Sequence, residues 1–236
     1  MVDLRFLKGL HMIIKLIKEY FRKEPKVFFT SDTHFYHARV IDYCNRPFKD
    51  VYKMNEHMIK VWNKTVKPFD IVYHLGDFSM GKKAHKEVVP RLNGTKILIS
   101  GNHCPTHVSH KNHLKIQQKY IDYGWAEIYP HTKELILKNG LKVLMSHLPY
   151  AKEGFDQRYL NFRPEDKGQV LLHGHLHGRY IKDGNQIDLG WDAHNGKILN
   201  EDELIAIIND KRINIKSHLT DFFNEERSKV SEESAD

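Results

Sequence analysis

The 236-residue sequence predicts an α/β fold, a four-layer αββα sandwich with two mixed β-sheets. Apolar, β-rich runs alternate with segments of helical spacing in the first half of the chain, and strand-like runs cluster in the second half. Five of these runs lead directly into polar residues, and they lie at residues 27–29, 71–73, 97–99, 143–145 and 170–172.

Local sequence signals mark the expected helices and turns. Helices are expected over residues 50–67, 84–91, 108–123 and 200–211, and a β-hairpin over residues 134–145 with a tight turn at Asn139-Gly140. Pro68 ends the first helical pattern before the next strand. Asn200, with Glu203 three residues later, is the signature of a capping box at the start of the last helix.

Seven residues able to ligate metal ions follow the five strand-like runs. They are Asp32, His34, Asp77, Asn102, His147, His175 and His177. Ligands of α/β sheets bind outside the carboxyl ends of the strands, so all seven are expected to converge on one rim. Imidazole, carboxylate and amide oxygen without thiolate favour Mn, Fe, Zn or Ni. Seven ligands exceed what one ion with an open catalytic position uses, so two ions are expected.

The order of these motifs resembles a known family. Asp-x-His, Gly-Asp, Gly-Asn-His, a lone His and Gly-His-x-His follow one another as in the calcineurin-like metallophosphoesterases, a superfamily of dinuclear phosphatases, phosphodiesterases and nucleases. The resemblance covers residues 27 to about 208. It implies the same sandwich and two divalent transition-metal ions, of which Mn is expected first and Fe, Zn or Ni are alternatives.

The resemblance also implies a role for each motif residue. Asp32, His34 and His177 are expected to hold one metal, Asn102, His147 and His175 the other, and Asp77 to bridge them. His103 matches the family histidine that faces the substrate and protonates or stabilises the leaving oxygen. A hydroxide held between the metals is expected to attack phosphorus. His37, Arg39 and Arg46 are the candidate substrate-binding residues, and Arg158 and Arg163 are further candidates for a phosphate clamp.

Three further segments resemble the branch of small bacterial and phage phosphoesterases. They are Asn45-Arg46-Pro47-Phe48, residues 172–178 and residues 188–192. Cys104 departs from the family, because many relatives carry an acidic residue after Gly-Asn-His. This departure removes an expected hydrogen bond around the metals but no metal ligand.

The expected function is that of a metal-dependent phosphodiesterase acting on nucleotides or other small phosphate esters. A DNA or RNA nuclease is the alternative within enzymes, and a catalytically silent binding or scaffold protein is the alternative outside them. The net charge of +7 suits a polyanionic substrate, so nucleic acid remains possible. It is not favoured, because no stripe of alternating basic and aromatic residues is present in the sequence.

The chain is expected to comprise three parts. Residues 1–25 are expected to form a basic amphipathic helix, which could pack on its own domain, mediate homo-oligomer contact or lie on a membrane. Residues 26–215 are expected to form the metallophosphoesterase domain. Residues 216–236 are expected to form a C-terminal helix and an acidic, disordered tail.

The cellular compartment is expected to be the cytoplasm. Cys44 and Cys104 lack metal or redox spacing and the sequence opens without a signal-peptide pattern, so reduced thiols are expected. No apolar run reaches the length of a transmembrane helix.

Overall fold

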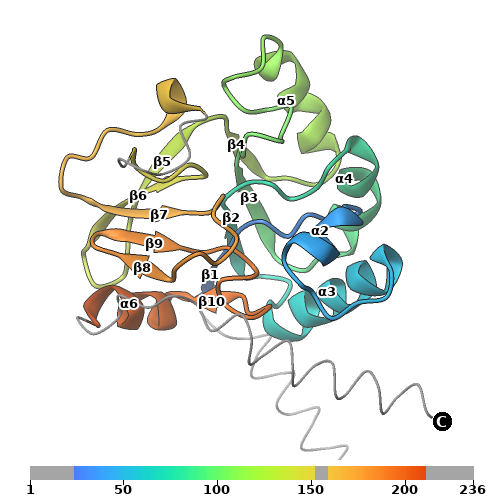
Figure 1. Ribbon diagram of the computed structural model, residues 1–236, viewed down its shortest axis with the longest axis horizontal. Helices are drawn as coiled ribbons and strands as arrows, with labels where there is room; N and C mark the ends of the chain where they lie inside the picture. The colour runs from blue at the N-terminus through green and yellow to red at the C-terminus, as the bar shows by residue number, and fades with distance from the viewer. Residues whose placement is uncertain (1–23, 152–158, 211–236) are drawn as a thin grey trace, which may run out of the picture.

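A computed structural model describes residues 24–151 and 159–210. Within these residues, two five-stranded β-sheets pack face to face (Figure 1). The first sheet has the order β10-β1-β2-β3-β4, where β1 is Val27–Thr30, β2 Ile71–His74, β3 Thr95–Ile99, β4 Glu127–Tyr129 and β10 Leu199–Asn200. The second has the order β5-β6-β7-β9-β8, where β5 is Thr132–Ile136, β6 Lys142–Ser146, β7 Val170–His173, β8 Lys182–Asp183 and β9 Gln186–Asp188.

Both sheets are mixed, as the sequence predicts. In the first, β1 to β4 run parallel and β10 pairs antiparallel with β1. In the second, β6, β7 and β9 run parallel, whereas β5 and β8 are antiparallel edge strands. The predicted hairpin is β5 and β6, with Ile136 opposite Lys142 and Gly140 at a φ of +83° in the turn.

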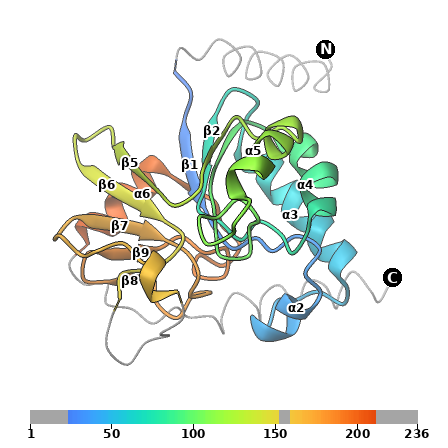
Figure 2. The same ribbon diagram turned by 90° about the horizontal axis from the view of Figure 1, so that it is seen from above.

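The helices lie mainly on the outer face of the first sheet, opposite the second sheet (Figure 2). They are α2 Arg39–Tyr43, α3 Val51–Thr65, α4 Lys82–Val88 with the short 3₁₀ turn η1 Val89–Arg91, α5 His113–Asp122, the 3₁₀ turn η2 Leu160–Phe162, and α6 Glu201–Asn209. The fold class is therefore confirmed: an α/β architecture of two mixed sheets with flanking helices.

Strand alternation divides the apolar side chains between two cores. Phe28 of β1 packs with Trp62 of α3 in the core between the first sheet and its helices. The next residue, Phe29, faces the opposite way and packs with Met145 of β6 and Leu172 of β7 between the two sheets. Strand β1 is thus apolar on both faces, as a strand in the interior of a doubly covered parallel sheet is.

Two helix starts are capped, the second as expected, and one helix is shorter than expected. The Asp50 side chain accepts hydrogen bonds from the backbone N–H groups of Tyr52 and Lys53 at the start of α3. Asn200 and Glu203 form the predicted capping box of α6. Helix α5 begins at His113 rather than at 108, because residues 103–112 form turns, one of them fixed by the bond from the Val108 N–H to the Pro130 carbonyl.

Several expectations lie outside the described residues. These are most of the N-terminal helix over 1–25, the segment 216–236 and Arg158. They stay predictions, as does self-association through the N-terminal helix. Among the helices of the described ranges, none is both long enough and apolar enough to cross a membrane.

A buried histidine makes the stability of this fold depend on pH. His85 lies in the helix-side core, where its Nδ1 accepts a hydrogen bond from Trp125 Nε1 at 3.0 Å. Burial lowers the pKa of His85 to about 3. Between about pH 6.5 and pH 3 the unfolded chain therefore binds a proton that the folded chain does not, and the free energy of unfolding falls as the pH falls.

We expect His85→Gln to flatten this dependence by up to roughly 1.4 kcal/mol per pH unit, the value for one proton. Urea unfolding at intervals between pH 4.5 and pH 6.5 measures the slope. Trp125→Phe serves as the control, because it removes the donor but leaves the titrating imidazole, so it should lower stability while keeping the slope. Parallel slopes for wild type and His85→Gln would contradict the interpretation.

Candidate metal centre

The structure brings the seven predicted ligands to one rim, formed by the carboxyl ends of strands from both sheets. Asp32 and His34 follow β1, Asp77 follows β2, Asn102 follows β3, His147 follows β6, and His175 and His177 follow β7. The ends of β1, β2, β6 and β7 thus supply the two carboxylates and the four histidines, and the end of β3 supplies the Asn102 amide. The topology explains why residues up to 145 positions apart in the chain meet at one place.

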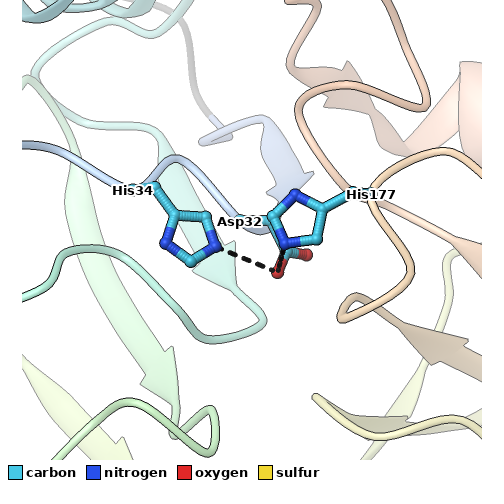
Figure 3. Close-up of side chains that lie close together, drawn as sticks. All are labelled: Asp32, His34 and His177. Carbon is cyan, nitrogen blue, oxygen red and sulfur yellow. Dashed lines mark ion pairs between the residues drawn. The ribbon is translucent and has the colours of Figure 1, made fainter. Parts of the chain in front are cut away.

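Three of these residues form a first cluster (Figure 3). Asp32 Oδ1 lies 3.8 Å from His34 Nε2 and 3.9 Å from His177 Nε2. Asp32 Oδ1 and His34 Nε2 are both buried, and neither has a hydrogen-bond partner among the described residues. Leaving a buried carboxylate oxygen unpaired costs free energy. A divalent cation would satisfy both atoms, so the residues present fit a metal ion.

Asp77 connects this cluster to a second one. Its Oδ2 lies 3.3 Å from His147 Nε2 and 4.0 Å from His34 Nε2. His147 Nε2 lies 3.1 Å from Asn102 Oδ1, and the His175 ring packs edge-on against the His147 ring at 5.3 Å between centroids. One carboxylate therefore stands between two groups of candidate ligands, as a bridging ligand must.

Hydrogen bonds select which imidazole nitrogen faces the centre. His147 Nδ1 lies 2.8 Å from the Leu75 carbonyl oxygen, which only accepts, so Nδ1 carries a proton and Nε2 is the nitrogen that can release one. His177 Nδ1 lies 3.2 Å from Asp192 Oδ2, which favours the same tautomer in the neutral ring. In its neutral form each ring thus turns the lone pair of Nε2, the atom that points to Asp77 or Asp32, toward a metal ion.

Burial and neighbouring charges shift the titration of these groups. Burial lowers the pKa of His34 well below its usual range, so this imidazole stays neutral. Burial alone would raise the pKa of Asp77, but His147 and His34 hold it well below its usual range. Burial opposes charge on His147 too, yet the Asp77 and Asp32 carboxylates raise its pKa to about 9. A cation entering the centre would displace that proton, so metal binding should be favoured by higher pH.

Most of the candidate ligands sit on an uncommon backbone conformation. Asp32, His34, Asp77, His175 and His177 all have φ between +49° and +72°. Side chains at these left-handed positions carry a cost of order 1–3 kcal/mol each where the surroundings hold them. Backbone hydrogen bonds do so here, from the Asp32 N–H to the Gly76 carbonyl and from the His34 N–H to the Asp77 carbonyl, both at 3.0 Å.

The open side of the centre carries two further histidines. The His103 side chain is 46% exposed, and its Nε2 lies 4.0 Å from Asp77 Oδ2. The His103 backbone N–H donates to Asp77 Oδ1 at 3.1 Å, which ties this residue to the carboxylate between the two clusters. His37 is half-buried, with its Nδ1 3.4 Å from His34 Nδ1. Arg39 is exposed at the first residue of α2.

The interpretation of Arg46 as a substrate clamp is corrected by the structure. Arg46 is 2% exposed, and its Nε and NH2 groups pair with both oxygens of Asp192 at 2.8 and 2.9 Å. NH2 also donates to the Asp32 carbonyl, and NH1 donates to the Thr33 carbonyl and approaches the Met54 sulfur. Every N–H of the guanidinium is thus used inside the protein, and none is left for a phosphate.

Two residues beside His177 were not assigned a role from the sequence. Asp192 accepts from His177 Nδ1, and the Cys44 sulfur lies 3.3 Å from the same nitrogen. The signal for Asp192 was its place in the segment 188–192, which resembles the phage branch. Cys44 gave no signal, because a single cysteine without spacing partners predicts no contact.

The fold and the geometry of the rim define the class of metal-dependent phosphoesterases. The calcineurin-like phosphoesterase superfamily domain matches residues 26–226, so the chain belongs to that superfamily. The family implies divalent metal ions, and the structure places Asp32, His34 and His177, and also Asp32, Asp77 and His147, close enough to hold them.

Individual relatives agree with this membership. The chain is 36% identical over 160 residues to an uncharacterized protein of Methanocaldococcus jannaschii, covering 66% of this chain and 72% of that protein. It is 32% identical over 198 residues to the gene 66 protein of Mycobacterium phage D29, covering 78% and 96% respectively. A crystal structure of a protein of unknown function from Aquifex aeolicus superposes with a TM-score of 0.59 at 28% identity, covering 78% of this chain and all of that one.

The close packing of this centre leads to a test at Gly174. A Cβ added to Gly174 would overlap the Ser31 hydroxyl and the Asp32 carboxylate. We expect Gly174→Ala to push the Asp32 carboxylate aside, to lower the free energy of unfolding by about 1–3 kcal/mol, and to reduce the metal bound per chain. Urea unfolding and elemental analysis measure the two effects.

Gly81→Ala is the matched control, because Gly81 has extended backbone and no atom within 4 Å of an added Cβ. It should leave both measurements at the wild-type values. Full metal content in Gly174→Ala would show that the Asp32 carboxylate does not contribute to binding as this geometry indicates.

Proposed function

We propose that this protein is a dinuclear phosphodiesterase that hydrolyses nucleotides or other small phosphate esters. In this proposal Asp32, His34 and His177 hold one divalent ion, Asn102, His147 and His175 hold the other, and Asp77 bridges them. The strongest support is the buried pair of Asp32 Oδ1 and His34 Nε2, for which the described residues provide no hydrogen-bond partner. The Asp77 carboxylate lies 4.0 Å from His34 Nε2 and links this pair to the second cluster of candidate ligands. Manganese is the expected metal, with iron, zinc or nickel as alternatives.

Two divalent ions at this rim would supply an activated water at neutral pH and would offset the charge that develops on phosphoryl oxygens. Only Asp32 and Asp77 contribute negative charge among the seven residues, which leaves the loaded site positive and attractive to phosphate. The ligand side chains, apart from the histidines after β7, are almost completely buried, so the protein excludes water on all but one side.

In this proposal His103 assists the departure of the leaving group. Its backbone is fixed to Asp77 while its imidazole reaches toward solvent on the open side, so the ring can donate a proton or hydrogen bond to the departing oxygen. His37, half-buried beside His34, is placed to donate a hydrogen bond to a phosphoryl oxygen. Arg39 is exposed near the same opening, two residues beyond His37.

We also propose that the protein works in the cytoplasm. Cys44 and Cys104 are both free thiols, and reduced cysteines are usual in that compartment.

The first test concerns the metals. Protein stripped by a chelator should lose hydrolysis and regain it with manganese, and elemental analysis of the active form should give about two ions per chain, since the seven ligands divide into two clusters around Asp77. A single ion in fully active protein would contradict the dinuclear assignment.

The second test concerns the substrate. Manganese-loaded protein should turn over a small diester such as a cyclic or dinucleotide efficiently, and should bind long nucleic acid weakly at physiological salt. Long strands need several phosphate contacts, so their binding would fall steeply with salt, whereas a small ester in one pocket responds gently. Tight binding and rapid cleavage of plasmid or oligonucleotide would favour a nuclease instead.

The third test concerns His103. His103→Ala should retain both metals and slow the hydrolysis of an ester with an alkoxide leaving group by about 10²–10⁴-fold, because general acid help has that size. The loss should be small for a nitrophenyl ester, whose leaving group departs without a proton. Asn102→Ala is the comparison, since it removes a proposed ligand and should lower metal content together with activity. Equal slowing of both esters in His103→Ala would show that His103 acts by position or charge rather than as an acid.

A further inference from the structure

A cavity apart from the candidate metal centre lies between α3 and the loop that precedes β10. It has a volume of about 560 Å³, and the residues that shape it include His57, Lys60 and Lys64 of α3 and His194, Asn195 and Lys197 of the loop. We call it the lysine pocket. None of the seven candidate metal ligands lines it.

The charge of the lysine pocket is positive and incompletely neutralised. Lys60 and Lys64 are four residues apart on α3, so their side chains share one face of the helix. No ion pair within the described part of the chain neutralises either of them, and no carboxylate lines the cavity. Lys197, in contrast, pairs with Glu203 at 2.7 Å. Two like charges at this spacing repel each other, and an anion bound between them removes that repulsion.

The lining of the pocket also offers contacts that a simple anion would not use. Asn195 lines the pocket, and residues 24–151 and 159–210 provide no N–H or O–H donor for its buried Oδ1. Val61 supplies an apolar wall, and the His57 imidazole, packed on Phe48 at 5.1 Å between ring centroids, supplies a ring surface. Small organic ligands occupy cavities of about 300–1,000 Å³, a range that includes this one and exceeds what inorganic phosphate needs.

We propose that the lysine pocket binds a nucleotide, separately from the metal centre. The phosphate groups would lie against the Lys60 and Lys64 ammonium groups. A ribose hydroxyl or the edge of a base would form a hydrogen bond with the Asn195 amide, which lines the pocket, and the base would pack on the wall formed by Val61 and His57. A small ligand is favoured over a nucleic-acid strand, because the pocket has the volume of a small-ligand site and the described part of the chain lines it with no aromatic stripe of the kind that stacks successive bases.

Calorimetric titration of the full-length protein with ADP tests the proposal. Excess EDTA keeps the metal centre empty, so neither turnover nor metal-bound phosphate contributes and the result is independent of the proposed function. We expect one ADP per chain. Lys60→Ala with Lys64→Ala should weaken ADP binding at least tenfold, and Asn195→Ala should weaken ADP binding severalfold without changing that of inorganic phosphate.

The matched control is Lys115→Ala with Lys119→Ala, which removes two exposed lysines at the same spacing from α5. It should change ADP affinity less than twofold. Three results would each overturn the proposal: an unchanged affinity in the Lys60 and Lys64 double variant, equal affinity for inorganic phosphate and ADP, or an oligonucleotide that binds more tightly than ADP through the same two lysines.

Discussion

The geometry of the metal centre depends on the buried ion pair between Arg46 and Asp192. Both side chains are fully shielded from water, and 146 positions separate them in the chain. A buried pair is stable only where the remaining donors and acceptors are satisfied, which the carbonyls of Asp32 and Thr33 and the His177 imidazole accomplish here. The guanidinium thus fixes the turn that carries Asp32, while the carboxylate fixes the ring of His177. Removing either partner would leave an uncompensated charge and would free two of the side chains proposed to hold one ion.

The same pair explains how the two sheets are held in register at the rim. Arg46 comes from the segment between α2 and α3 on the first sheet, and Asp192 follows β9 of the second. The loop that carries Asp192 returns to the first sheet, where the Trp191 N–H donates to the Ser31 carbonyl at 2.8 Å and β10 pairs with β1. It also carries His194 and Asn195 into the lysine pocket. One loop therefore borders both the candidate metal centre and the lysine pocket, and its position is set by the charge pair beside the candidate ligands.

The sequence predicted that the seven candidate ligands converge, because their signal is local and their convergence follows from topology. Apolar runs that end in Asp, Asn or His, and the rule that parallel strand ends meet, were enough to group residues from Asp32 to His177. Arg46 was misread because guanidinium matches phosphate and carboxylate equally well, and only the fold brings Asp192 within reach. The expected start of α5 at residue 108 was wrong for a similar reason, because contacts with distant residues hold 108–112 in turns. The His110 ring forms a hydrogen bond with the Asn102 carbonyl, and the Val108 N–H donates to the Pro130 carbonyl. The lysine pocket had no sequence signal beyond the spacing of Lys60 and Lys64, since its other wall comes from a distant loop.

Hydrophobic periodicity could not predict the left-handed backbone at five of the seven candidate ligands. This conformation bears on what holds the site together. These conformations are held by bonds between neighbouring loops, such as that from the His175 N–H to Asp32 Oδ2 at 2.9 Å, and by glycines that let the loops approach. Bonds of this kind hold the seven candidate side chains on one rim. In small zinc domains, by contrast, the metal supplies the folding energy and the apo chain is unfolded. Here two extended apolar cores, one between the first sheet and its helices and one between the two sheets, supply hydrophobic stabilisation that does not come from a metal ion. Packing and hydrogen bonds in the rest of the fold therefore offset the backbone strain at the five candidate ligands, as strained residues at functional sites require.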